Sequence, residues 1–314
     1  MKIEPRRLLE LLAVARHGSI SGAAEAVNMS QPALSQSIAL LEREVGVKVL
    51  ERGRQGARLN DFGDALVFYA QALESLLGRA GEEIRMRSLG LEGTLALGIT
   101  PVTAVDLVPR CLELLMRESP NIAIKVIDGL DQEITEMLRT RQLDVLVRRL
   151  GIAPQYTDIE EEPLFGVDWS LIAAPDHPLA QRASVRLRDL ADVQWVLPAG
   201  GSAFRQQMEL VFTSVGQAWP VRGISTNSIL AIKAIVMNSA CVSVISPRLV
   251  EVEAAAGRLK VIPLEDVGPP RPVGLVWRRG EKLSPVAARF AKILRTLAQE
   301  ETDLRDAASA TAAP

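Results

Sequence analysis

The stretch that most constrains this chain is residues 19–44, which reads as two short helices joined by a tight turn. Ala23 and Ala24 on the first helix are small enough for a second helix to cross closely. Ser30 is a good N-cap for that second helix, since its hydroxyl can accept an orphan backbone N–H. Pro32 falls in the first turn, where a missing N–H costs nothing. The pattern predicts a helix-turn-helix.

The second of these helices has two unlike faces. Apolar residues recur at helical spacing and predict its buried stripe, namely Leu34, Ile38, Leu41 and Val45. The other face is polar but nearly uncharged, which suits the reading of base edges in a major groove better than simple solvation. This face also carries Ser37, and its candidate DNA-contacting residues, counted from the cap onward, are Ser30, Gln31, Pro32, Ser35, Gln36 and Arg43. An ordinary helical hairpin with a polar outer face is the alternative.

The flanking segments favour DNA binding over that alternative. An apolar helix precedes the pattern, and a basic segment with glycines follows it at residues 51–60. The basic segment predicts a two-stranded wing, whose arginines would contact phosphates on either side of the second helix. These arginines are Arg52, Arg54 and Arg58.

The run from residue 11 to residue 52 resembles the N-terminal winged helix-turn-helix of LysR-type transcriptional regulators, without a gap. The matching residues are Gly18-Ser19, Ala23-Ala24, the run SQPALS at 30–35, Leu41-Glu42, Gly46-Val47 and Glu51-Arg52. The chain departs from the family at Gln36, where arginine is common, at Ile20, where an aromatic is usual, and at Asn60-Asp61, near the usual capping threonine. The resemblance implies a DNA-binding domain over residues 1–60, with double-stranded operator DNA and RNA polymerase as partners.

Charge is distributed as this interpretation requires. The 314 residues carry a formal net charge of −2, but residues 1–60 hold three excess positive charges and the remainder five excess negative ones. A basic module on an acidic body limits non-specific DNA binding while it keeps local attraction for phosphate. Two cysteines exclude a disulfide framework. No signal peptide or membrane span is recognisable, so a cytoplasmic protein is expected.

Residues 61–88 read as one long helix, capped by Asp61, that ends in a hinge; residues 61–90 form the expected linker. Its apolar stripe is Phe62, Leu66, Tyr69, Leu73, Leu76, Leu77, Ala80 and Ile84. A helix with one such stripe and no core of its own needs a partner. A homodimer through this helix is favoured over packing against the chain's own C-terminal part. The resemblance implies the same dimer, and a homotetramer built as a dimer of dimers.

From residue 91 to 301 strands and helices alternate, which predicts an α/β fold with parallel pairing. The turn at 177–180 and the segments 246–248 and 256–259 also resemble the LysR family. The resemblance implies a two-subdomain effector domain similar to periplasmic binding proteins. Subdomain 1 is expected over 91–164 and 268–301, and subdomain 2 over 165–267. Residues 302–314 lack an apolar face and are expected to be disordered.

In such a fold a ligand lies between the subdomains, at strand ends and helix N-termini, where free N–H groups favour anions. The candidate effector-binding residues are Thr100, Pro101, Val102, Arg148, Gly201, Ser202, Thr226, Asn227, Ser228 and Ser246. Singly, the Ser, Thr and Asn residues are explained by N-capping, but together they favour a site for a small anionic organic metabolite. Arg148 and Arg149, at the end of a strand, are either a solvated pair or supply a carboxylate-binding arginine at the rim of the cleft.

Two other functions fit the sequence less well than a ligand-responsive regulator. Peroxide-sensing members of the family use a cysteine pair, but Cys111 and Cys241 are expected in different subdomains as buried structural residues. An enzyme carrying a DNA-binding module lacks support, since no nucleophile motif, phosphate-binding loop or metal cluster is present; His17 and His177 stand too far apart. No catalytic residue, metal or cofactor is therefore expected. The effector, the operator and the direction of regulation are not named by the sequence.

Overall fold

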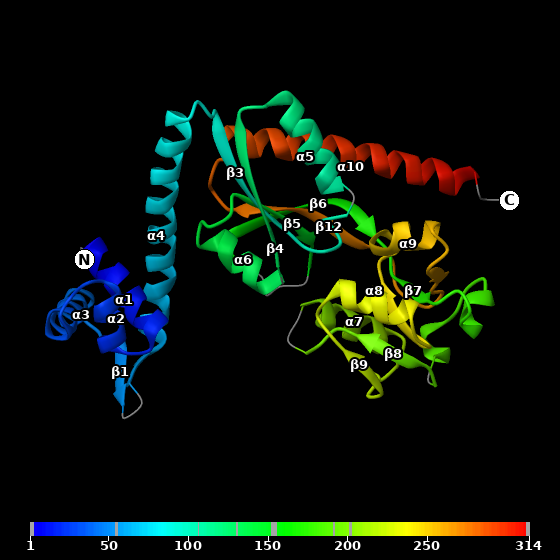
Figure 1. Cartoon of the computed structure of the whole chain (residues 1–314), viewed down its shortest axis with the longest axis horizontal. Helices are drawn as coiled ribbons and strands as arrows, with labels where there is room; N and C mark the ends of the chain where they lie inside the picture. Colours follow the sequence, from blue (N-terminus) through cyan, green and yellow to red (C-terminus); the bar gives the residue numbers. More distant parts are fainter. Residues whose placement is uncertain are drawn as a thin grey trace. The chain divides into compact units, whose positions relative to one another are not determined.

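The computed structural model describes residues 3–53, 56–105, 107–129, 131–151, 156–190, 192–200 and 203–311 (Figure 1). The chain forms two compact units. The first consists of residues 1–91 with 139–142, and the second of 92–138 with 143–314.

The first unit is a winged helix-turn-helix followed by a long helix. Its elements are α1 (Pro5–His17), α2 (Ile20–Ala26), α3 (Gln31–Val45), β1 (Leu50–Gly53), β2 (Gly56–Leu59) and α4 (Asp61–Ser88). The predicted cap is confirmed, because Ser30 Oγ accepts from the Ala33 N–H at 3.3 Å. Leu34, Ile38 and Leu41 are buried as expected. The wing strands pair antiparallel, so the predicted fold of this unit is correct.

Helix α4 has the predicted bounds but a different cap. Asn60 Oδ1 accepts from the Gly63 N–H at 3.0 Å, so the cap is Asn60 and not Asp61. Asn60 has extended backbone angles, as an N-cap requires, whereas Asp61 is already helical. A side chain at Gly63 would collide with the Val49 carbonyl, which shows how closely α4 approaches the wing. Within the single chain, much of the apolar stripe is exposed, namely Phe62, Tyr69, Leu76, Leu77 and Ile84.

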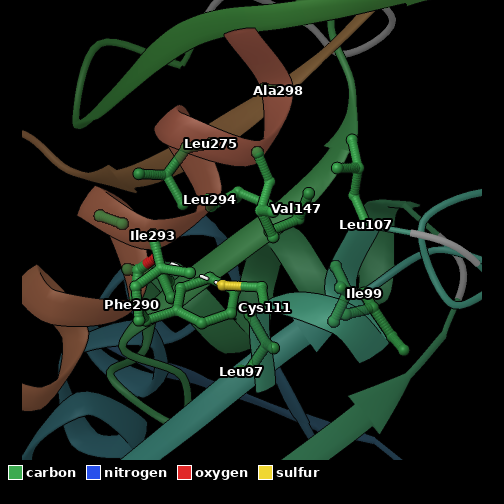
Figure 2. Packing of buried hydrophobic residues seen from close by; sticks show 14 of the residues in the cluster. Leu97, Ile99, Leu107, Cys111, Val147, Leu275, Phe290, Ile293, Leu294 and Ala298 are labelled. Atoms are coloured by element: carbon green, nitrogen blue, oxygen red, sulfur yellow. Dashed lines mark hydrogen bonds between the residues drawn. The ribbon is translucent and has the colours of Figure 1, made fainter. Parts of the chain in front are cut away.

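The second unit contains two five-stranded sheets. The first has the order β4-β3-β5-β12-β6, formed by β3 (Gly93–Ile99), β4 (Ile122–Asp128), β5 (Val145–Arg149), β6 (Ile159–Val167) and β12 (Arg271–Arg278). Strands β3, β4 and β5 are parallel, and β12 runs antiparallel between β5 and β6. Its helices are α5 (Leu107–Glu118), α6 (Asp131–Arg139) and α10 (Pro285–Thr311). Figure 2 shows the core in which Leu97 and Val147 of this sheet pack against Phe290 and Leu294 of α10.

The second sheet has the order β11-β7-β10-β8-β9. It is formed by β7 (Ser170–Ala173), β8 (Gln194–Leu197), β9 (Gly223–Ser225), β10 (Cys241–Ile245) and β11 (Lys260–Pro263). Three helices, α7 (Ala203–Ser214), α8 (Ile229–Met237) and α9 (Glu251–Ala255), accompany it with the short 3-10 turns η1 (Pro178–Gln181), η2 (Leu187–Asp189) and η3 (Pro247–Val250). The α/β architecture is the one predicted, but the pairing is not parallel throughout, because β7 runs antiparallel to β10 and β11 here, as β12 does to its neighbours in the first sheet.

Two boundaries differ from the prediction. Strand β6 continues to Val167, which pairs with Arg271, so the chain leaves the first sheet after residue 167 and not at 164. Helix α10 continues to Thr311, where a disordered tail was expected from residue 302. The alanines at 307, 308 and 310 have high helix propensity, which explains the extension. Of the helices in the described ranges, none combines the length and apolar character needed to cross a bilayer.

One buried carboxylate joins helix α3 to the wing. Glu42, 8% exposed, accepts from Lys48 Nζ at 2.6 Å and from the Val49 N–H at 3.1 Å. Burial raises the pKa of Glu42, but the hydrogen bonds from Lys48, Val49 and Leu50 outweigh it, so the net pKa lies below its usual value. The ionised form is therefore the one that holds the wing against α3.

Replacing Glu42 with Gln should destabilise the wing by about 1–3 kcal/mol at pH 7, because charge-assisted hydrogen bonds are lost. The lowered pKa means that this contribution is present above the ordinary glutamate pKa and disappears as the pH falls through the folded value. Hydrogen–deuterium exchange of residues 42–53 measures the difference. Glu25→Gln, on an exposed position of α2, is the matched control. Equal exchange in both variants at pH 7 would contradict this role.

Candidate functional site

The first candidate surface is the solvent face of α3 and the wing. Gln31, Pro32, Gln36 and Arg43 are exposed on α3, and Ser35 is half-buried. Pro32, Gln36 and Arg43 follow one another at spacings of four and seven, which places them along one line of the helix. Amide and guanidinium groups on such a line can reach base edges in a major groove.

Not every polar residue of α3 is available for this role. The Ser30 hydroxyl caps the helix, and the Ser37 hydroxyl donates to the Glu10 carboxylate. On the wing, Arg58 is exposed on β2. The side chain of Arg52 and the whole of Arg54 lie outside the described residues.

The second candidate is a pocket in the second unit, lined on one side by the first sheet and its connections and on the other by helices and loops that accompany the second sheet. Its volume is about 610 Å³, including space open to solvent. The first sheet and its connections supply Thr100, Pro101, Val102, Gly129, Asp131 and Arg149; the other side supplies Phe204, Gln207, Asn227, Ile229 and Leu249. The turn that carries Thr100 is fixed by Thr103, whose hydroxyl donates to the carbonyls of Thr100 and Val147. Polar groups on a mostly apolar wall are typical of a small-molecule site.

Arg149 is the principal cation in this pocket. It ends β5, is only 6% exposed, and lies over the ring of Trp169 with its guanidinium carbon 4.2 Å from the ring centroid. Burial lowers the pKa of Arg149 to about 10; Asp131 and Asp168 oppose this effect and Arg271 adds to it. The group therefore stays charged at neutral pH. Its Nη1 has no hydrogen-bond partner within the described chain.

Other buried polar atoms of the pocket share this property. Among the residues that the structure describes, no partner is present for Thr100 Oγ1, Asp131 Oδ1 or Gln207 Oε1. Buried polar atoms are normally hydrogen-bonded, and exceptions gathered in one pocket indicate a binding site. Burial also raises the pKa of Asp131, although the nearby charges of Arg148 and Arg149 oppose that shift.

The structure brings together only some of the predicted effector residues. Thr100, Pro101, Val102 and Asn227 line the pocket. Gly201 and Ser202 lie outside the described residues. The hydroxyls of Thr226 and Ser228 accept from the N–H groups of Ser228 and Ala231, so both act as local caps, as their simpler explanation required.

The remaining two predicted residues lie elsewhere. Arg148 is fully buried and donates from Nη2 to Glu161 at 2.7 Å, so it is the neighbouring arginine, Arg149, that lines the pocket. Ser246 is buried at the end of β10 and is not among the lining residues.

Sequence reasoning missed four polar or glycine residues of the pocket. Asp131, Gln207 and Gly129 were not singled out from the sequence, and Arg149 was considered only together with Arg148. A side chain at Gly129 would collide with the buried Ile134, so the close packing beneath this part of the pocket requires glycine. The signal that could have identified Asp131 is its position at the start of a helix that follows a strand by only two residues.

The cysteines occupy the cores of two different sheets. Cys111 of α5 is fully buried, and its Sγ donates to the Phe290 carbonyl of α10 at 3.5 Å (Figure 2). Burial, with a smaller effect of Glu118, raises the pKa of the Cys111 thiol to about 12. Cys241 packs in the other sheet with Ile172 and Val236. A thiol so protonated is a poor nucleophile, which argues against a redox pair.

Two family models match the chain. The bacterial regulatory helix-turn-helix protein, lysR family, matches residues 5–64, and the LysR substrate binding domain matches residues 88–299. The first match ends in the first turn of α4 and the second begins at its last residue, so most of this helix lies between the two matches.

Proteins and structures over the whole length are also similar. The RuBisCO operon transcriptional regulator of Allochromatium vinosum is 30% identical over 296 residues, which cover 94% of this chain and 96% of that protein. Full-length CbnR complexed with its target DNA has a TM-score of 0.65 at 23% identity and covers 94% of this chain and 99% of its own. A full-length cysteine variant of OxyR from Pseudomonas aeruginosa has a TM-score of 0.63 at 25% identity, covering 94% and 98%.

Neither cysteine should react with Ellman's reagent in the native protein at pH 7, because both are buried and the raised pKa of Cys111 leaves almost no thiolate. Labelling should become fast only in denaturant, and glutathione measured alongside gives the rate of an accessible thiol. A redox sensor would behave oppositely. Its cysteines would be labelled rapidly, and peroxide would change its affinity for DNA. The double variant Cys111→Ser with Cys241→Ser would no longer show that peroxide response.

Proposed function

The chain belongs to the LysR family of bacterial transcriptional regulators, and we propose that a small organic anion bound against Arg149 switches its activity. The observation that carries this proposal is the buried Arg149 guanidinium, which lines the pocket with an unpartnered Nη1. A desolvated cation of this kind attracts a carboxylate more strongly than a solvated one does. The N-terminal ends of α6 and α8 supply Asp131, Asn227 and Ile229 to the same pocket.

On the DNA side, the chain is a DNA-binding regulator, and we assign base reading to α3 and phosphate contacts to the wing. Gln31, Gln36 and Arg43 are the proposed base readers; Ser35 stands beside them, and Pro32 shapes the start of the helix. Arg58 on β2 is the proposed phosphate contact. Such a regulator meets its DNA, and RNA polymerase, in the cytoplasm.

We assign dimerisation to α4. The five exposed apolar side chains along this helix support the proposal, because a stripe of that size is costly to leave in water. A second copy of the same helix is a partner of matching chemistry, and LysR-type regulators of this architecture are expected as dimers or dimers of dimers.

The two other functions receive less support. The burial of Cys111 and Cys241 in separate cores disfavours the redox regulator, despite the similarity to OxyR. The similar proteins are described as transcriptional regulators, and this disfavours an enzyme.

Gln36→Ala should relax sequence preference at one base pair by about 1–3 kcal/mol, because an amide that pairs with one base edge is lost. Arg58→Ala should instead weaken binding to all sequences and reduce the salt dependence. Binding to a set of single-base operator variants by fluorescence anisotropy separates the two effects. Ser37→Ala is the control, since its hydroxyl is turned to Glu10. If Gln36→Ala keeps the full preference, the assignment of this face is wrong.

A thermal-shift screen of small organic acids tests the effector site. An acid at about 100 times its dissociation constant should add about 2.7 kcal/mol of stability to the native protein. Arg149→Gln should abolish this gain and leave operator binding without ligand unchanged. Thr226→Ala is the matched control, because its hydroxyl serves the local turn and Thr226 does not line the pocket. Stabilisation that survives in Arg149→Gln would place the effector elsewhere.

A further inference from the structure

Two opposite charges line the same pocket without pairing. Arg149 and Asp131 both border it, and no hydrogen bond or ion pair joins the two described side chains. Each retains a buried atom with no partner among the described residues, Nη1 on Arg149 and Oδ1 on Asp131. Nη1 can only donate a hydrogen bond, and an ionised carboxylate can only accept one.

This arrangement is unfavourable for the protein alone. Burial shifts the pKa of each group towards its neutral form, and the attraction between the two charges offsets this shift only in part. Two opposite charges that line one pocket would normally either form an ion pair or remain hydrated. Arg149 is instead held by the ring of Trp169, while Asp131 is the first residue of α6. Their separation is therefore set by the two elements that carry them.

Resting on the proposed function, we infer that the effector carries two poles: an anionic group that binds Arg149 and a hydrogen-bond donor, ammonium or hydroxyl, that binds Asp131. Substituted acids such as hydroxy acids and amino acids fit this description. A plain acid leaves the carboxylate of Asp131 desolvated and unpaired, and a plain amine does the same to Arg149. Asp131 is thus a specificity-determining residue of the site.

The rest of the pocket agrees with such a ligand. Gln207 Oε1 and Thr100 Oγ1 are two further buried atoms that can accept a hydrogen bond from the ligand. The Gln207 amide can also rotate and donate, so Asp131 carries the selectivity. The apolar part of the wall suits a short carbon skeleton between the poles, and consists of Val102, Phe204, Ile229 and Leu249.

Matched sets of acids test this inference on the full-length protein. The probes are succinate, L-malate and L-aspartate, and benzoate, 3-hydroxybenzoate and 3-aminobenzoate. Each set keeps one skeleton and adds a hydroxyl or an amino group. Dissociation constants are measured by calorimetry for the wild type, Asp131→Ser, Asp131→Asn and Arg149→Gln. Serine removes the carboxylate but keeps a side-chain oxygen that is favourable at the start of a helix. Asparagine keeps the shape of the aspartate side chain without its charge.

In at least one set, the donor-bearing acid should bind the wild type about tenfold or more tighter than the plain acid, as expected for a hydrogen bond to a buried charge. Both Asp131 variants should reduce that preference below about threefold, and Arg149→Gln should weaken every member of the set. The melting temperature of ligand-free Asp131→Ser should not fall, because an unpaired buried carboxylate is removed.

The failures are distinguishable. If plain and substituted acids bind equally well, if both variants keep the preference, or if Asp131→Ser melts several degrees lower, the inference is overturned while an acid effector on Arg149 stands. If no acid of either set binds, or if the acids bind Arg149→Gln as tightly as the wild type, the proposed effector site is wrong and so is the inference that rests on it.

Discussion

The stacking of Arg149 on Trp169 is the contact on which the effector unit depends. Arg149 ends the last parallel strand of the first sheet, and Trp169 lies where the chain passes to the second sheet. Phe204 of α7 stacks on Trp169 in turn, with ring centroids 5.7 Å apart. A guanidinium held by an aromatic face keeps its charge without a carboxylate partner. The cation that can bind an effector is thereby attached to the segment that joins the two sheets.

A second contact limits how far those sheets can separate. Arg248 on η3 pairs with Glu301 of α10, and its guanidinium lies 5.0 Å from the Phe165 ring centroid on β6. Helix α10 packs on the first sheet, while η3 follows β10 of the second. A ligand shifts such a unit only by its different affinity for two arrangements. Arg149 belongs to the first sheet and Asn227 precedes α8, which accompanies the second sheet. A ligand that contacts both residues is therefore sensitive to the relative position of the two sheets, whereas an N-cap such as Ser228 is not.

The difference between what could and could not be predicted follows from the range of the interactions. The winged helix-turn-helix depends on interactions between residues close in sequence, such as capping by Ser30 and the spacing of Leu34, Ile38 and Leu41. Such interactions can be predicted from the sequence alone. The pocket depends on which face of β5 each arginine occupies. Alternation from Val145 and Val147, which belong to the α10 core, continues to Arg149, whereas Arg148 follows Leu146. Since every residue of β5 is buried, polarity alone did not separate the two arginines.

The role of Asp131 is hidden in the sequence for a similar reason, since this residue opens helix α6. A carboxylate in the first turn of a helix is favoured by the helix dipole wherever it occurs, so sequence assigns it that role and no other. The dipole, however, acts equally on an exposed carboxylate and gives no reason for burial. What separates the two roles is the surroundings that tertiary structure adds: Asp131 Oδ1 is buried without a partner among the described residues, and Arg149 places a positive charge in the same pocket. Asp131 is favourable for the local helix but unfavourable as a buried charge with an unpartnered oxygen. Such a conflict between local and tertiary preferences is expected where a fold loses stability in order to bind a ligand.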